Sequence, residues 1–349
     1  MPEFAHGLVI GKFYPLHAGH SALIRTALQA CERVTVELLV ASVESVSLET
    51  RAEWIREEHP TVTLRTAVDD APVDYGSEKA WVEHMTVISG LLDSPVDAVF
   101  TSDAYGEELA RRLDAQWVQV DPDRSLTPVS GRAVRRDPAA NWHWLSSPVR
   151  ASLTRRVVVL GAESTGSTTL AAALADHYST LWVPEYGREH TLTRVGGATA
   201  PWRSDEFELI VDRQLALEQD AARRVPTPLL VCDTDVFATA LWHERYVGTA
   251  NERLWARAAD HPPLLYVLTG DEIPFVPDGT RDGEHIRHDM QQRFRDELAA
   301  QGVPWLEVRG SVEQRVAAAV AAIDPALREA LRFAEPLDAS SGSASRLSE

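Results

Sequence analysis

Short apolar runs rich in β-branched residues alternate with helical stretches along nearly the whole chain. The runs that predict strands are Gly7–Phe13, Val34–Ser42, Val62–Val68, Ala98–Ser102, Trp117–Asp121, Arg156–Ala162, Leu181–Glu185, Leu229–Asp235, Leu264–Gly270 and Trp305–Arg309. Helices are predicted between them, such as His20–Ala30 and Glu206–Arg224, the latter with apolar residues at helical spacing. This alternation predicts parallel sheets covered by helices on both faces. Phosphate ligands would then bind beyond the carboxyl ends of the strands, at helix N-termini.

The alternation restarts near residue 156, and this restart predicts two domains. We place the first α/β domain over residues 1–136 and the second over residues 155–330, with a packed, aromatic-containing connector over residues 137–154. The Ser- and Gly-rich residues 338–349 are predicted to be disordered. The predicted fold class is therefore α/β, with two doubly wound parallel-sheet domains.

Composition narrows the possible partners. The 349 residues include 34 Lys+Arg against 52 Asp+Glu, for a net charge of −18. An acidic chain argues against a general nucleic-acid-binding surface. No apolar run approaches the roughly 18–20 residues that span a bilayer. The two cysteines, Cys31 and Cys232, are too few for a disulfide framework or a zinc site, so a reducing, cytoplasmic setting is expected.

The segment Gly11–His20, GKFYPLHAGH, follows the first predicted strand and opens a helix. His17 and His20 are three residues apart and share one face of the first helical turn, and Gly19 between them leaves room for a phosphate. The helix N-terminus adds N–H donors and partial positive charge. With Lys12, one of only two lysines, this pattern predicts a cradle that stabilises charge during phosphate transfer. One alternative is that both histidines lie in a solvated turn. The other is that they bind a metal ion, although no third ligand lies nearby in the sequence.

GKFYPLHAGH resembles the signature of the nucleotidylyltransferase superfamily, in the form seen in NadR-type nicotinamide mononucleotide adenylyltransferases. Residues 47–54 (SLETRAEW), 120–124 (VDPDR) and 129–135 (VSGRAVR) extend the resemblance. The last segment is similar to the second superfamily motif, in which a serine opens a basic helix. Ser130 can cap that helix, and its first turn and Arg135 can contact the β- and γ-phosphates of ATP. The alternative for these arginines is a solvated charged face.

The resemblance implies that a mononucleotide phosphate attacks the α-phosphate of ATP and that Mg²⁺-pyrophosphate leaves. It assigns catalytic roles to Lys12, His17, His20 and Arg135, and ATP contacts to Gly11, Phe13, Gly19, Arg51 and Ser130. Trp81 matches the aromatic residue that grips the substrate ring and can stack on a nicotinamide cation, although a core tryptophan is the alternative. Only Trp81 and the domain fusion favour nicotinamide mononucleotide over pantetheine phosphate or a flavin mononucleotide.

Residues 161–168, GAESTGST, lie between a buried strand run and a helical segment and match the P-loop pattern, except that Ser167 stands where lysine is expected. The backbone N–H groups of such a loop still form an anion nest, and Thr168 can still reach Mg²⁺. Loss of one preorganised donor, such as the ammonium group of this lysine, commonly lowers the rate about 10²–10³-fold. Neither lysine lies in this half of the chain, so any replacement charge must come from arginine. The predicted ATP contacts are Gly161, Ser164, Thr165, Gly166, Ser167, Thr168 and Thr169.

The resemblance continues in chain order into the ribosylnicotinamide kinase domain of NadR proteins, through residues 184–189 (PEYGRE), 232–235 (CDTD) and 277–287 (PDGTRDGEHIR). It implies that Glu185 is a base or ribose anchor and that Asp233 orients Mg²⁺ or activates a hydroxyl group. The remaining implied contacts are Tyr186, Arg188 and Asp235 to the substrate, and Arg281 and Arg287 to the transferring phosphate. For each residue taken alone, a helix cap or a salt bridge is the alternative.

The resemblance covers about residues 5–325 and lacks the helix-turn-helix repressor domain of some NadR proteins, which argues against DNA-binding regulation. We therefore expect an NAD salvage enzyme that uses ATP and Mg²⁺ to adenylylate nicotinamide mononucleotide and to phosphorylate nicotinamide riboside. A nucleotide-sensing second domain without catalysis is the alternative for that half. Neither a membrane nor a nucleic acid is expected as a partner, and homo-oligomerisation is left open.

Overall fold

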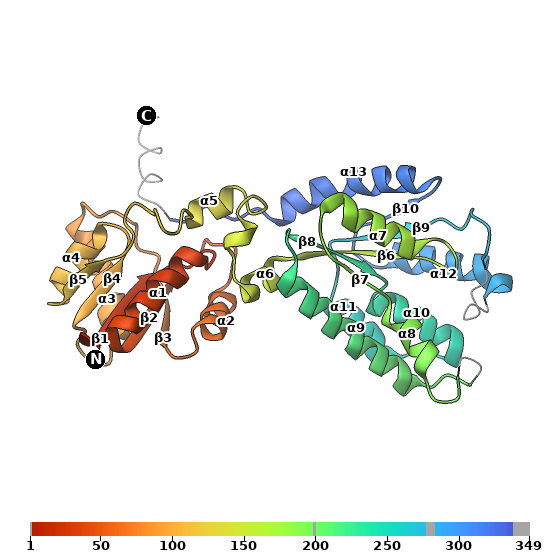
Figure 1. Cartoon of the computed structure of the whole chain (residues 1–349), viewed down its shortest axis with the longest axis horizontal. Coiled ribbons are helices and arrows are strands. Elements are labelled where there is room, and N and C mark those ends of the chain that lie inside the picture. Colours follow the sequence, from red (N-terminus) through yellow and green to blue (C-terminus); the bar gives the residue numbers. More distant parts are fainter. Residues whose placement is uncertain (1, 198–199, 277–282, 338–349) are drawn as a thin grey trace. The chain divides into compact units, whose positions relative to one another are not determined.

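The computed structural model describes residues 2–197, 200–276 and 283–337. The chain divides into two compact units (Figure 1). The first comprises the chain up to Ser152 together with residues 332–337, and the second comprises Leu153–Leu331. Arg281 and the tail 338–349 lie outside the described residues. Among the described residues, none of the helices has both the length and the apolar character that crossing a membrane requires.

The first unit is built on a five-stranded parallel sheet with strand order β3-β2-β1-β4-β5. Its strands are β1 (Phe4–Gly11), β2 (Cys31–Val40), β3 (Thr63–Val68), β4 (Ala98–Thr101) and β5 (Gln116–Gln119). Its helices are α1 (Ala18–Ala30), α2 (Leu48–Glu58), α3 (Glu78–Leu91), α4 (Tyr105–Arg112), α5 (Gly131–Arg136), the 3₁₀ helix η1 (Trp142–Trp144) and α6 (Ser147–Leu153), which ends at the boundary between the units. Because β1 is central, the loop that follows it leaves the middle of the sheet.

The second unit repeats this architecture with strand order β10-β9-β6-β8-β7, again fully parallel. Its strands are β6 (Arg155–Leu160), β7 (Trp182–Val183), β8 (Leu229–Asp233), β9 (Leu265–Thr269) and β10 (Trp305–Val308). Its helices are α7 (Ser167–Tyr178), α8 (Tyr186–Thr193), α9 (Ser204–Arg224), α10 (Val236–Val247), α11 (Glu252–Asp260), η2 (Glu284–Ile286), α12 (Arg287–Ala300) and α13 (Val312–Ala330). The loop after its central strand, β6, is the predicted phosphate loop.

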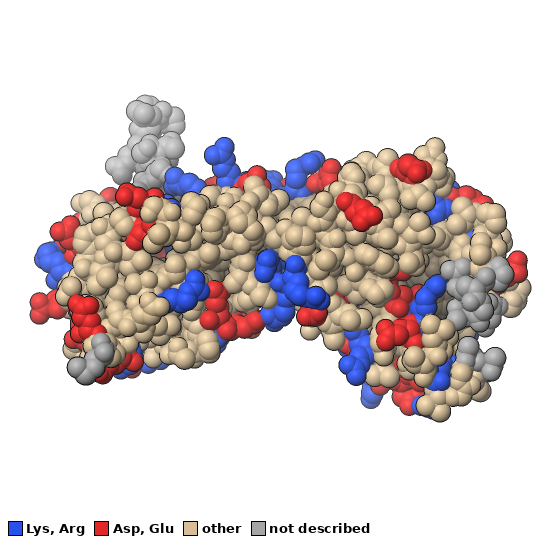
Figure 2. All heavy atoms as spheres, in the orientation of Figure 1, with Lys and Arg blue, Asp and Glu red and all other residues tan. Residues whose placement is uncertain are grey.

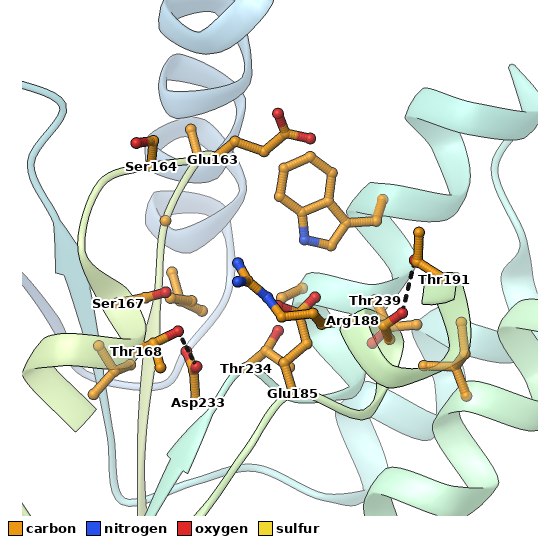
Figure 3. Close-up of a pocket in the computed structure, with 18 of the residues that line it drawn as sticks. Glu163, Ser164, Ser167, Thr168, Glu185, Arg188, Thr191, Asp233, Thr234 and Thr239 are labelled. Atoms are coloured by element: carbon orange, nitrogen blue, oxygen red, sulfur yellow. Dashed lines mark hydrogen bonds between the residues drawn. The ribbon is translucent and has the colours of Figure 1, made fainter. Parts of the chain in front are cut away.

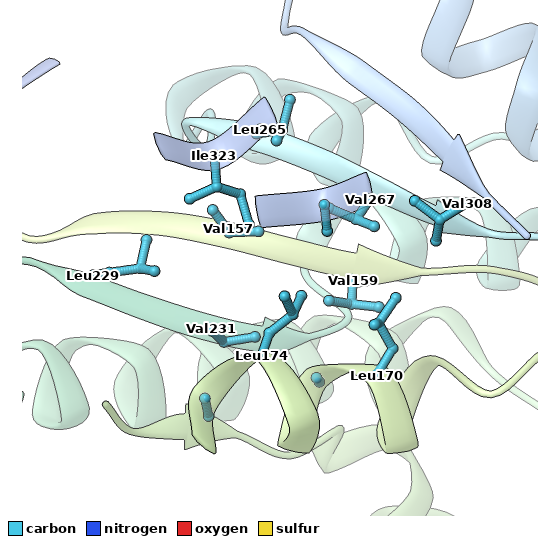
Figure 4. Close-up of a cluster of buried hydrophobic side chains, with 13 residues drawn as sticks. Val157, Val159, Leu170, Leu174, Leu229, Val231, Leu265, Val267, Val308 and Ile323 are labelled. Carbon is cyan, nitrogen blue, oxygen red and sulfur yellow. The ribbon is translucent and has the colours of Figure 1, made fainter. Parts of the chain in front are cut away.

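Both faces of the second sheet are covered. Figure 4 shows one face, where alternate valines and leucines of β6, β8, β9 and β10 pack against α7 and α13. Ile323 of α13 and Leu174 of α7 are fully buried in this cluster. On the other face, Tyr266 of β9 is buried and packs on Phe237 of α10, with ring centroids 5.2 Å apart. Burial on both faces explains why these strands are continuous apolar runs in the sequence.

The predicted α/β fold class is confirmed, as are all ten predicted strands, with differences at their ends. The first strand ends at Gly11 instead of Phe13 because Phe13 has a left-handed backbone, with φ of 43°. The first helix begins at Ala18 instead of His20 because His17 caps it. On the face shown in Figure 2, acidic and basic side chains of the described residues are interspersed over both units.

Candidate functional site

His17 is the N-cap of α1 and points its ring back over the first helical turn. Its backbone is extended, and its Nδ1 accepts hydrogen bonds from the N–H groups of Gly19 at 3.2 Å and His20 at 3.4 Å. An imidazole nitrogen that accepts carries no proton, so in the neutral ring the proton lies on Nε2. The helix N-terminus thus selects the tautomer that presents Nε2–H as a donor.

The two histidine rings of the signature stack at 3.7 Å between centroids and 22° between planes. His17 is 5% exposed and His20 is half-buried. Burial, aided by the nearby Arg124 and Arg135 guanidinium groups, lowers the pKa of His17 to about 3. Burial and the neighbouring His17 likewise lower the pKa of His20 well below its usual value. Both rings are therefore neutral at physiological pH and act as directed hydrogen-bond groups, while the positive charge comes from arginine.

Gly19 lies close to the His17 ring. A Cβ at Gly19 would lie 3.1 Å from His17 Cε1 and 3.2 Å from Nδ1, closer than the ring can tolerate without shifting. Phe13 is buried and contacts the His20 ring edge-on at 5.1 Å, and Gly11 packs against the Phe13 ring. Gly11 and Phe13 therefore shape the loop, whereas Gly19 lets the histidine cap form.

The second predicted motif lies beside the first. Ser130 caps α5 as predicted, because its side chain accepts from the N–H of Ala133 at 3.1 Å. Arg135 of the same helix donates to the backbone carbonyl of Tyr14 at 2.6 Å, and its charge acts on both imidazoles. Arg124, the last residue of the VDPDR segment, had no predicted role, but its charge also acts on both rings, and it pairs with Asp103 at 3.2 Å.

A buried ion network lies below the signature loop. The side chain of Glu44 is fully buried and bridges Lys12 Nζ at 3.3 Å and Arg51 Nη1 at 2.6 Å. Arg51, itself 0% exposed, also donates to the carbonyls of Lys12 and Val46. This geometry gives Arg51 a supporting role under the loop instead of the predicted ATP contact. Lys12 is partly exposed and can still reach a ligand.

Trp81 lies in the core of the first unit. It is 6% exposed, packs with Leu109 and Ile88, and donates its indole N–H to the Tyr75 carbonyl at 3.1 Å. The Arg112 guanidinium covers its ring at 5.0 Å. These contacts favour the core alternative over the predicted stacking on a substrate ring.

The second unit contains a pocket of about 330 Å³ at the end of its central strand (Figure 3). Its lining combines the phosphate loop, α8, the end of β8 and a group of aromatic residues. The predicted residues in the lining are Gly161, Ser164, Gly166, Ser167, Thr168, Thr169, Glu185, Arg188 and Asp233. The sequence motifs of this half therefore converge on one cavity.

Two arginine side chains bind backbone carbonyls of the phosphate loop. Arg315 donates to the Thr165 carbonyl at 2.6 Å, and Arg287 donates to the Ser164 carbonyl at 3.0 Å. Ser164 and Gly166 have left-handed backbones, with φ of 60° and 87°. A Cβ at Gly161 would lie 2.4 Å from Thr269 Oγ1. With its carbonyls bound behind it, the loop can direct its N–H groups toward an anion. Arg287 is thus placed behind the loop, away from its predicted contact with a transferring phosphate.

Thr168 and Asp233 form a buried hydroxyl–carboxylate pair. Thr168 Oγ1 donates to Asp233 Oδ2 at 2.5 Å, and the Ser167 hydroxyl also binds this carboxylate. Asp233 is 2% exposed, and its burial raises its pKa, against the opposing effects of these hydrogen bonds and the Arg188 charge. A hydroxyl and a carboxylate beside a phosphate loop are the oxygen donors that Mg²⁺ takes, so the residues fit this ion. Among the described residues, no group of three or more His, Cys, Asp or Glu side chains is arranged so that it could hold a metal ion by itself.

Arg188 supplies the only cation in the described lining of this pocket, which otherwise has the carboxylates of Glu163, Glu185 and Asp233. Figure 3 shows it extending from α8 across the pocket toward Ser167 and Thr168. Its charge acts on Asp233, the partner of Thr168. An arginine therefore lies near the position where the P-loop lysine is missing.

Four described residues predicted for this site do not line the pocket: Thr165, Tyr186, Asp235 and Arg287. Thr165 is buried and donates its hydroxyl to the Ala162 carbonyl at 2.7 Å. Tyr186 donates its backbone N–H to Gln214 Oε1 at 3.0 Å. Asp235 is buried, caps α10 by accepting from the Ala238 N–H, and accepts from the Tyr266 hydroxyl at 3.0 Å. This geometry favours the helix-cap alternative for Asp235 over a substrate contact.

An aromatic wall formed by Trp202, Phe207 and Tyr246 was missed by sequence reasoning. The Trp202 ring lies 5.1 Å from Phe207 and 5.4 Å from Tyr246, and all three line the pocket. The Arg194 guanidinium covers Trp202 at 3.7 Å. No motif connects these positions, since they come from a loop, α9 and α10, which meet only in the folded unit.

Comparisons with known proteins cover both units. Residues 156–315 match a family described as an AAA domain. The chain is 25% identical over 325 residues to the trifunctional NAD biosynthesis/regulator protein NadR of Escherichia coli, covering 86% of this chain and 78% of that protein. It is 25% identical over 296 residues to NadR of Salmonella typhimurium, covering 79% and 71%.

Solved structures agree in fold. A NadR protein crystallised with NR matches with a TM-score of 0.70 at 19% identity, covering 93% of this chain and 96% of that one. A NadR protein crystallised with NAD and AMP-PNP matches with a TM-score of 0.65 at 18% identity, covering 94% and 97%. The resemblance inferred from the sequence motifs is thereby confirmed. The chain is a homologue of NadR through both of its units.

Proposed function

We propose that this protein is an NAD salvage enzyme with two ATP-dependent activities. The first unit transfers AMP from ATP to nicotinamide mononucleotide, and the second phosphorylates nicotinamide riboside. The observation that carries the proposal is that each unit places its phosphate-binding motif at the carboxyl end of its central strand, as ligand sites in open α/β sheets are placed. Homology with the NAD biosynthesis protein NadR supports the choice of substrates. The solved relatives bound to NR and to NAD with AMP-PNP support it further.

In the first unit, a phosphate oxygen of the mononucleotide attacks the α-phosphorus of ATP. The bond from that phosphorus to the bridging oxygen breaks, and pyrophosphate leaves. The neutral Nε2–H of His17 donates to a phosphate oxygen, the partial positive charge at the N-terminus of α1 attracts the phosphates, and Arg135 balances the developing charge. No side chain of this constellation forms a covalent intermediate, so catalysis comes from positioning and charge stabilisation.

In the second unit, the 5′-hydroxyl oxygen of the riboside attacks the γ-phosphorus of ATP, and ADP leaves. Thr168 and Asp233 would hold Mg²⁺, which neutralises charge on the β- and γ-phosphates when bound. Arg188 supplies the cation that Ser167 cannot. Glu185 and Asp233 are the pocket carboxylates that can accept the hydroxyl proton. The aromatic wall of Trp202, Phe207 and Tyr246 offers π-faces for the positively charged nicotinamide ring.

We also propose a reducing, cytoplasmic setting for both reactions. Cys31 and Cys232 are both buried and unpaired. Burial raises the pKa of the Cys31 thiol to about 11, so it remains protonated and inert. Free thiols of this kind are typical of compartments kept reduced.

The adenylyltransferase assignment is tested by incubating the purified chain with ATP and nicotinamide mononucleotide and measuring NAD and pyrophosphate. His17→Ala and His20→Ala are each expected to lower the rate at least about 10²-fold. Thr168→Ala, in the other unit, is the matched control and should leave this rate unchanged. A parental rate in both histidine variants would refute the mechanism. Pantetheine phosphate and flavin mononucleotide, offered in parallel, distinguish the other transferases.

The kinase assignment is tested by phosphorylation of nicotinamide riboside with the same preparation. Turnover that is lost in Thr168→Ala and retained in His17→Ala supports the assignment. ATP binding without turnover would instead favour the alternative of a nucleotide-sensing domain. Calorimetric titration with a non-hydrolysable ATP analogue separates binding from catalysis.

A further inference from the structure

The described end of the chain returns to the first unit and packs against the signature loop. We call residues 332–337 the C-terminal strap; they follow α13 in the chain but belong to the first unit. Phe333 of the strap contacts Tyr14 edge-on, with ring centroids 5.4 Å apart. The Tyr14 hydroxyl donates to the carbonyl of Ala334 at 3.0 Å. The strap is thereby bound to Tyr14, which lies within the signature segment GKFYPLHAGH.

Ser45 ties the strap to the neighbouring loop. The N–H of Ala334 donates to Ser45 Oγ at 3.1 Å, and Ser45 Oγ lies 2.7 Å from the Tyr14 hydroxyl. The N–H of Ser45 also donates to that hydroxyl, at 3.0 Å. Because the Tyr14 hydroxyl has one proton, which Ala334 accepts, both Ser45 groups act as its donors. The result is a closed set of hydrogen bonds among Tyr14, Ser45 and Ala334.

Tyr14 transmits the position of the strap to the arginines of the site. Its ring is 2% exposed and is covered by the guanidinium of Arg51 at 4.2 Å and that of Arg135 at 5.1 Å. Its backbone carbonyl accepts from Arg135 at 2.6 Å. Removal of Phe333 would leave one side of this ring uncovered and allow the ring and Arg135 to move.

Lys12 makes the second link. Its Nζ donates to the carbonyl of Leu337 at 3.0 Å and pairs with Glu44 at 3.3 Å. Phe333 therefore acts on Arg135 indirectly, through Tyr14, whereas the Leu337 carbonyl contacts Lys12 directly. The strap thus reaches both of these cationic side chains of the site. The sequence motifs do not indicate the contact between Lys12 and Leu337, because the two residues are 325 positions apart in the chain.

We propose that the C-terminal strap is a positioning element of the adenylyltransferase site, which holds Tyr14, Arg135 and Lys12 where the phosphates of ATP bind. The proposal rests on the proposed adenylyltransferase function of the first unit. It has a structural consequence: a fragment that ends near Ser152 lacks the strap, and its site is incomplete.

The test compares Phe333→Ala with Phe4→Ala in the full chain. Both residues are half-buried, and each makes an edge-on contact with an aromatic ring of the first unit, Phe4 with Phe100 at 6.2 Å. Phe4, however, begins β1 at the end opposite to the signature. We expect Phe333→Ala to raise the KM for ATP in NAD formation about tenfold or more, with the KM for the mononucleotide within about twofold of the parent. Phe4→Ala should change neither constant.

Several results would overturn the proposal. Adenylyltransferase constants within about twofold of the parent in Phe333→Ala would do so, as would an equal loss in Phe4→Ala. A lower kcat with both KM values unchanged would show that the strap only stabilises the fold. If Phe333→Ala does not fold, Ala334→Pro, which removes the N–H donor to Ser45 and also restricts the backbone of residues 333 and 334, replaces it with the same expectations.

A readout without activity separates this proposal from the proposed function. Amide hydrogen exchange of residues 13–20 should be faster in Phe333→Ala than in the parent and unchanged in Phe4→Ala. If the parent forms no NAD but this exchange pattern holds, the proposed function fails while the strap still positions the loop. If the parent forms NAD and the exchange of residues 13–20 is unchanged, the strap proposal fails alone.

Discussion

The imidazole rings of His17 and His20 stack at 3.7 Å, and the Nδ1 of His17 accepts the backbone N–H of His20. A protonated His17 would lose this acceptor and would place a charge beside the second ring and near two arginines. The stack is therefore stable only when the rings are neutral, and this agrees with the lowered pKa of both histidines. The two histidines therefore act as uncharged hydrogen-bonding groups in a site whose positive charge comes from arginine.

This neutrality predicts a pH effect on stability. The folded His17 has a pKa of about 3, whereas an unfolded histidine titrates near 6.5. Between these values the unfolded chain binds a proton that the folded chain does not, so the free energy of unfolding of the first unit falls as the pH drops below about 6.5. Ring carbon chemical shifts of His17 and His20 should stay constant from about pH 8 to pH 5, and the same rings in urea should titrate. Titration of either ring near pH 6.5 in the folded protein would contradict this.

Gly19→Ala is predicted to impair the first site through His17. The added Cβ would lie 3.1 Å from the His17 ring, which must shift by a few tenths of an ångström and so distort the cap. Because a misplacement of about 1 Å can cost about 10²-fold in rate, we expect this smaller shift to lower NAD formation about tenfold, with kinase activity retained. Gly90→Ala is the matched control, because a Cβ at Gly90 in α3 has nothing within 4 Å. Equal rates for the two variants would show that the cap geometry does not matter.

Arg188→Gln is predicted to lower riboside phosphorylation about 10²–10³-fold, since it removes the one cation of the described pocket lining. Adding Ser167→Lys to this variant should restore at least about tenfold, because the lysine returns the charge to the P-loop position. Arg253→Gln, an exposed arginine outside the pocket, is the control. Failure of the double variant to recover would indicate that Arg188 acts in some way other than as the missing charge. A structural role would instead lower the melting temperature of both variants.

Glu37→Leu is predicted to stabilise the first unit increasingly as the pH rises from about 4.5 to about 8. Glu37 of β2 is 0% exposed, neither of its carboxylate oxygens has a partner among the described residues, and burial raises its pKa to about 8. The unfolded glutamate deprotonates near pH 4.5, so the folded state loses stability as the pH rises from about 4.5 toward 8. We expect Glu37→Leu to exceed the parent by roughly 2–4 kcal/mol at about pH 9 and by much less at about pH 5.

The control for this prediction is Glu32→Leu, an exposed glutamate of the same strand. Its effect on the free energy of unfolding should be small at both pH values. Denaturant melts of the first unit measure both variants. A stability difference between Glu37→Leu and the parent that does not change with pH would show that Glu37 does not titrate in this range.

The sequence by itself determined the strands, the two parallel sheets and the placement of both phosphate motifs. These features depend on local patterns: apolar runs at strand period, a histidine pair at helical spacing, and glycines where a backbone turns. His17, Ser130 and the phosphate loop were predicted for this reason. The sequence also indicated that Ser167 leaves the phosphate loop without the positive charge of the usual lysine. It indicated that an arginine must supply this charge but did not identify which arginine.

Only the tertiary structure decided which side chains reach each site. Trp81 and Asp235 have residue types suited to ligands, but packing buries them in a core and in a helix cap. Trp202 and Tyr246 carry no motif, yet the meeting of a loop and α10 places them in one pocket. Likewise, Phe333 reaches Tyr14 only through the return of the chain to the first unit. Contacts between residues distant in sequence depend on how whole elements pack, and a local pattern does not contain that information.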